Sequence, residues 1–62
     1  MRIVDFQTGK EIRDVAVSLT EEEMLDLSLY LNRLKSDQRI SCAHLTEVSG
    51  SHFLSELTVV KA

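Results

Sequence analysis

The chain has 62 residues, of which 44% are hydrophobic and 27% are charged, with ten acidic against seven basic side chains. This length allows one small domain, residues 1–62, and its longest wholly apolar run, from Leu29 to Leu31, is too short to cross a membrane. The net charge of −3 argues against a nucleic-acid-binding protein, because such proteins neutralise phosphates with clustered Lys and Arg.

A domain of this size buries only about 60% of the surface that its unfolded chain exposes, so its stability is marginal without further support. Cys42 is the only cysteine, which excludes an internal disulfide and makes a reducing compartment, the cytoplasm, the expected location. Two histidines and one cysteine fall short of the four ligands of a closed structural zinc site. We therefore expect no cofactor, and association with a second copy as the source of support.

The first part of the chain predicts a β-hairpin. Residues 2–7 and 12–19 are rich in Ile, Val and Phe, and Gly9 between them can adopt the positive φ of a tight turn. In the second segment Val15, Val17 and Leu19 alternate with small or polar residues, which is typical of a strand with one apolar face.

A helix is expected from Thr20 to about Ser36. Its first residues, Thr-Glu-Glu-Glu, have the capping-box form, in which the Thr hydroxyl and the third Glu satisfy each other's backbone amides. One helical stripe is predicted to pack on a sheet, and it contains Met24, Leu27, Tyr30, Leu31 and Leu34.

The last part predicts a second hairpin, with strands over residues 40–48 and 52–61 and a three-residue loop that contains Gly50. Such a loop pairs even-numbered with even-numbered residues, whereas a two-residue loop, Ser49-Gly50, would mix polar and apolar faces. With even pairing, the expected core face carries Ala43, Leu45, Phe53, Leu57 and Val59. The opposite face carries Ile40, Cys42, His44, Thr46, Leu54, Glu56, Thr58 and Val60.

The order strand, strand, helix, strand, strand predicts an α+β fold with a single two-layer domain. Its simplest form is ββαββ, with one helix packed on a four-stranded, mainly antiparallel sheet. The order of the strands within the sheet is not determined by this pattern.

Two apolar surfaces remain uncovered in this fold. Leu25 and Leu29 lie on the helix side opposite the core stripe, among polar residues. Isolated exposed leucines are common, but a one-helix layer also leaves the outer face of the sheet open to water. We therefore expect a homodimer, without deciding between the helix side and the sheet face. The expected interface residues are Leu25, Leu29, Ile40, Leu54 and Val60.

Four residues are candidates for chemistry. Cys42 and His44 lie two positions apart on one strand and so share a face, and Glu56 lies across from them. A thiol, an imidazole and a carboxylate form an activated nucleophile when they are in contact, and together with His52 they are candidate zinc ligands. The spacing matches no dense metal motif, and Cys is usually a small buried hydrophobe, so no catalytic residue is predicted.

The sequence thus favours a small cytoplasmic, homodimeric interaction or regulatory module without catalytic activity, which leaves room for an unidentified protein partner. The first alternative is a metal-binding or small-ligand-binding protein, enzymes included, with a site around Cys42, His44, His52 and Glu56. The second is a nucleic-acid-binding protein that uses the sheet face or the side chains of Arg2, Arg13 and Arg39.

Overall fold

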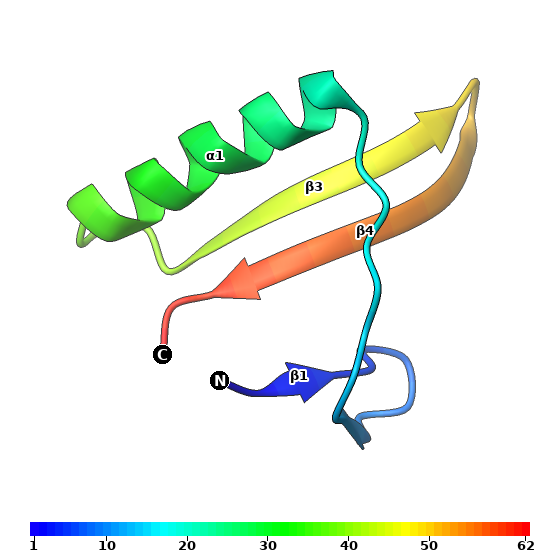
Figure 1. The fold of residues 1–62 in the computed structure, drawn as a ribbon, viewed down its shortest axis with the longest axis horizontal. Coiled ribbons are helices and arrows are strands. Elements are labelled where there is room, and N and C mark those ends of the chain that lie inside the picture. Colours follow the sequence, from blue (N-terminus) through cyan, green and yellow to red (C-terminus); the bar gives the residue numbers. More distant parts are fainter.

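A computed structural model describes all residues, 1–62, as one helix and two separate antiparallel hairpins. In chain order the elements are β1 (Ile3–Val4), β2 (Glu11–Ile12), α1 (Glu21–Ser36), β3 (Cys42–Ser49) and β4 (His52–Val60) (Figure 1). The α+β class is confirmed. The single four-stranded sheet is not confirmed, because β1 pairs with β2 alone and β3 with β4 alone.

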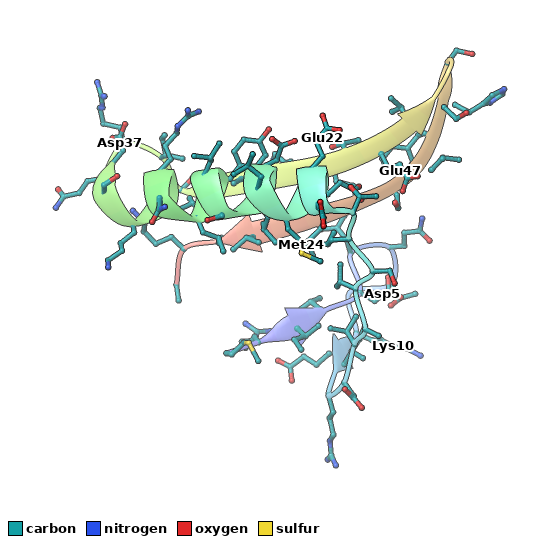
Figure 2. The ribbon with its side chains drawn as sticks, turned by 45° about the horizontal axis from the view of Figure 1, so that its top comes forward. Asp5, Lys10, Glu22, Met24, Asp37 and Glu47 are labelled. Atoms are coloured by element: carbon teal, nitrogen blue, oxygen red, sulfur yellow. The ribbon has the colours of Figure 1, made fainter.

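Helix α1 lies where the sequence predicts it. The hydroxyl of Thr20 accepts from the amide of Glu23 at 3.2 Å, and the Glu23 carboxylate accepts from the amide of Thr20 at 2.9 Å. Acidic residues occupy the first turn and basic residues the last, as the helix dipole favours. Figure 2 shows Glu22 near the start of the helix and Asp37 just beyond its other end. Helix α1 is neither long nor apolar enough to cross a membrane.

Strands β3 and β4 form a long hairpin whose turn differs from the prediction. Ser49 pairs with His52, so the loop has two residues, Gly50 and Ser51, rather than three. Gly50 has φ 61° and no other residue type has a positive φ, which is the pattern of a type II′ turn. Even-numbered residues nevertheless pair with even-numbered ones from Cys42 to Thr46, because β4 contains one extra residue, Leu54, in a β-bulge.

This bulge moves Phe53 to the other face of the hairpin. Residues paired across two strands share a face, and Phe53 pairs with Val48 while Glu56 pairs with Thr46. Phe53 therefore lies on the outer face with Glu56, and its assignment to the core face was wrong.

The helix covers little of the hairpin. It lies against β3 and does not reach over β4 (Figure 1). Leu34 is the only buried residue; Leu27 and Tyr30 are half-buried, and Met24 and Leu31 remain exposed. The predicted stripe thus faces β3, but one helix on two strands encloses almost no core.

The first hairpin is much shorter than predicted. Ile3 pairs with Ile12 and Val4 with Glu11, around a turn in which Gly9 has φ 72°. The pairing of β1 with β2 ends at Ile3 and Ile12, and residues 15–19 pair with no strand. That segment accordingly runs as an extended connection to the helix, and β1 and β2 contact neither α1 nor the β3–β4 hairpin (Figure 1).

Candidate functional site

The most extensive feature of the surface is the outer face of the β3–β4 hairpin, the face turned away from α1. Four apolar side chains project from it, and more than half of the surface of each is exposed: Val48 (61%), Phe53 (60%), Leu54 (54%) and Val60 (66%). No segment of the chain covers this face, because the helix lies against the other one. Val48, Phe53 and Leu54 lie together beside the turn, whereas Val60 lies opposite Cys42 at the other end of the hairpin, and the polar side chains between them are His44, Thr46, Glu56 and Thr58.

The structure places the expected interface residues in three positions. Leu54 and Val60 lie on the outer face of the hairpin and are exposed. Leu25 and Leu29 are exposed on α1. Ile40 is half-buried at the connection between α1 and β3. Sequence reasoning missed Phe53, whose place on the outer face depends on the bulge.

A polar cluster lies near the other end of the same outer face. His44 is at its centre: its Nε2 atom is 3.7 Å from the Sγ atom of Cys42. Its Nδ1 atom is 3.0 Å from a carboxylate oxygen of Glu56 and 2.9 Å from the hydroxyl oxygen of Thr58. The pairing of His44 with Thr58 and of Thr46 with Glu56 brings these side chains together across the two strands. The side chains of His44 and Glu56 remain partly exposed to solvent.

His52 does not join this cluster. It pairs with Ser49 beside the turn, six residues along β4 from Thr58, which corresponds to roughly 20 Å of strand. One chain contains no group of three or more His, Cys, Asp or Glu side chains arranged to hold a metal ion. Of the four candidate residues, the structure therefore assembles three, and it assembles them as a line through His44 rather than around a common point.

A shallow hollow of about 270 Å³ lies beside Cys42. Its walls come from the helix and from the start of β3, and they are formed by Tyr30, Arg33, Ile40, Cys42, Ala43 and His44. The hollow is open to solvent. The hydrogen-bonded thiol and imidazole lie at its edge. Such a pair can act as a nucleophile with its base or as two metal ligands.

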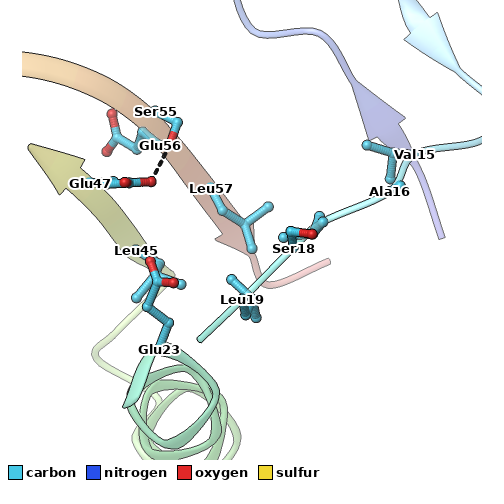
Figure 3. A pocket seen from close by; sticks show the side chains of 11 residues that line it. Val15, Ala16, Ser18, Leu19, Glu23, Leu45, Glu47, Ser55, Glu56 and Leu57 are labelled. Carbon is cyan, nitrogen blue, oxygen red and sulfur yellow. Dashed lines mark hydrogen bonds between the residues drawn. The ribbon is translucent and has the colours of Figure 1, made fainter. Parts of the chain in front are cut away.

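A second hollow, of about 330 Å³, lies on the helix side of the hairpin (Figure 3). Leu19, Leu45 and Leu57 line it from the connecting segment, β3 and β4, and the carboxylates of Glu23 and Glu47 lie at its rim. The alternation of Val15, Val17 and Leu19 was the sequence signal for this wall. It predicted an apolar face correctly but assigned it to a paired strand.

The basic residues offer no continuous surface for nucleic acid. The guanidinium of Arg2 contacts the Glu11 carboxylate at 2.8 Å, and that of Arg39 contacts Asp37 at 3.1 Å. Two of the three arginines considered for phosphate binding are therefore paired with carboxylates at opposite parts of the molecule. Comparisons of the chain with protein families, with curated proteins and with solved structures give no match.

Proposed function

We propose that this protein is a homodimeric protein–protein interaction module, in which two copies pack through the outer faces of their β3–β4 hairpins. The observation that carries this proposal is the surface area of one copy. A compact monomer of 7.0 kDa exposes about 4,000 Å². This chain exposes 5823 Å².

The excess is spread over the whole molecule, including the first hairpin, which contacts no other element, and part of it lies on the outer face of β3–β4. It amounts to roughly 1,800 Å² per chain, and permanent homodimers bury about 1,000–2,500 Å² per partner. Covering Phe53, Leu54, Val48 and Val60 also removes from water the apolar area that a stable fold of this length needs. Each such side chain contributes about 1.5–3 kcal/mol when fully buried, against a total stability of only about 5–15 kcal/mol for a typical domain.

The hairpin face supports this role better than the helix side. It combines four apolar side chains on one two-stranded surface, whereas the helix side offers Leu25 and Leu29 alone. Two such faces packed against each other form a sheet-on-sheet arrangement, and two-fold symmetry makes each face its own complement. We place this dimer in the cytoplasm, because the free thiol of Cys42 is compatible with a reducing compartment.

The test is the mass of the protein in solution, by gel filtration with light scattering at micromolar concentration in reducing buffer. The wild-type chain is expected to elute as two copies. Leu54→Glu introduces a charge into the proposed interface and is expected to abolish the dimer. Leu25→Glu is the matched control, since it changes a leucine of similar exposure on the helix side (61% against 54%) and is expected to leave the dimer intact.

Two results would contradict the proposal. A monomeric wild-type protein with its helix and strands retained by circular dichroism removes its basis, whether or not the variants fold. A dimer that survives Leu54→Glu and is lost with Leu25→Glu assigns the interface to the helix instead.

A further inference from the structure

The distance between Cys42 and His44 matches that of two ligands on one zinc ion. Their Sγ and Nε2 atoms are 3.7 Å apart. In a tetrahedral site with Zn–S near 2.3 Å and Zn–N near 2.0–2.1 Å, two such ligand atoms are about 3.6 Å apart. Both side chains project from the same face of β3, so one ion can contact both without a change of the backbone.

The other side of the imidazole is already arranged as metal-binding histidines require. Nδ1 faces the carboxylate of Glu56 and the hydroxyl of Thr58, so the proton of the neutral ring is held on Nδ1. The lone pair of Nε2 then points toward Cys42. Metal-bound histidines usually donate their second N–H to a carboxylate in this way, which fixes the ring and raises its basicity.

We propose that two copies of this chain bind one zinc ion between them, through Cys42 and His44 of each copy. One chain supplies two ligands and cannot close a site, but two chains supply the Cys₂His₂ set of a structural zinc centre. The inference rests on the proposed dimer, since these residues lie on the outer face through which the copies pack. The ion displaces one proton from each thiol, and the two thiolates balance its charge of +2.

The location on this face also favours the metal over catalysis. A nucleophilic thiol must remain accessible to its substrate, whereas a structural metal is closed off by its ligands. A second copy packed over Cys42 blocks the access of a substrate to the thiol, and it supplies the two remaining ligands of the metal site.

The experiment uses the full chain without a histidine tag, stripped of metal and kept in reducing buffer. Native mass spectrometry after addition of Zn²⁺ is expected to show one ion per two chains. Co²⁺ added in place of zinc is expected to give the thiolate-to-cobalt charge-transfer band and the intense visible bands of a tetrahedral site. One ion per chain, or no zinc above the background of the stripped protein, would overturn the inference.

Variants assign the ligands. Cys42→Ser and His44→Gln are expected to abolish the stoichiometric site, and His52→Ala, the matched change of the other histidine, is expected to retain it. Glu56→Gln is expected to weaken zinc binding about 10–100-fold while keeping the cobalt spectrum, and Glu47→Gln, on the other face of the hairpin, is expected to have no effect. Unchanged zinc affinity in Cys42→Ser contradicts the assignment.

The metal-free protein separates this inference from the proposed function. A metal-free dimer that binds no zinc overturns the zinc site and leaves the apolar interface. A monomer that becomes a dimer only with zinc retains the site and overturns the apolar face as the sufficient cause of association. A monomer under both conditions overturns both proposals.

Discussion

Asp37 joins the end of the helix to the start of β3. Its carboxylate accepts from the backbone amide of Arg39 at 3.0 Å and from the guanidinium of the same residue at 3.1 Å. Its own amide donates to the carbonyl of Arg33, and its carbonyl accepts from Ile40 and from the ammonium of Lys61. The side-chain and backbone hydrogen bonds from Arg39 hold the pKa of Asp37 below its usual value, with smaller contributions from the charges of Lys61 and Arg33.

The lowered pKa gives Asp37→Asn a pH-dependent effect on stability. Because the pKa is lower in the folded than in the unfolded chain, the ionised carboxylate stabilises the fold above about pH 4, and this contribution is lost as pH falls through the folded-state pKa. Thermal unfolding at one fixed protein concentration is expected to show a lower Tm for Asp37→Asn at pH 7 and no difference from wild type at the acidic end. Asp14→Asn, whose carboxylate makes no hydrogen bond, is the control; a difference for Asp37→Asn that persists in acid would contradict the assignment.

The candidate site was predictable only in the part that strand geometry controls. Spacing of two along a strand places Cys42 and His44 on one face, and even pairing brings Glu56 across from them. Contact between the thiol and the imidazole depends on their rotamers, which the sequence does not specify. His52 shares the even numbering, but the bulge at Leu54 turns it to the face of Ser49, opposite to that of His44, and it lies at the far end of the hairpin.

At the scale of elements, the helix is the feature best specified by sequence. The capping box, the acidic first turn and the basic last turn act over four residues at most, so no distant contact is needed to fix the bounds of α1. Thr20→Ala removes one half of the box and leaves the amide of Glu23 without its partner. We expect a loss of about 0.5–2 kcal/mol in the free energy of unfolding, measured by urea denaturation.

Thr20→Ser keeps a hydroxyl at the same position and serves as the matched variant. It is expected to retain most of the stability of the wild-type protein, because Ser is at least as good an N-cap as Thr. Equal losses for Ala and Ser at this position would show that the hydroxyl does not cap the helix.

The hairpins were harder to predict than the helix, because their structure depends on the register in which the two strands pair. Gly9 and Gly50 were correctly identified as turn residues, and both have positive φ. The bulge at Leu54 has no local signal, yet it shortens the second loop and turns Phe53 to the outer face. The apolar alternation of residues 15–19 is real, but no strand pairs with that segment. An alternating pattern predicts an extended segment with one apolar face, and pairing requires a second strand of matching length.

The whole molecule is too open for its length. Its radius of gyration is 12.7 Å, whereas a compact domain of 62 residues has about 10.5 Å. The extension arises from the arrangement of the elements: the first hairpin lies apart from the others, and the helix covers one strand of the second (Figure 1). A chain in which Leu34 alone is buried gains little from folding as a single copy, so in the proposed dimer the folded state and the association of two copies are coupled.

This coupling predicts that the stability of the protein depends on its concentration. When two unfolded chains form one folded dimer, each tenfold increase in chain concentration stabilises the dimer by about 1.4 kcal/mol, and the Tm rises accordingly. Metal-free wild-type protein unfolded thermally at concentrations spanning a hundredfold is expected to show this rise. Leu25→Glu is expected to keep the same dependence, because its side chain lies outside the proposed interface. A cooperative transition at the same Tm throughout the range would mean that one copy folds alone, and that the exposed outer face of the hairpin is not required for stability.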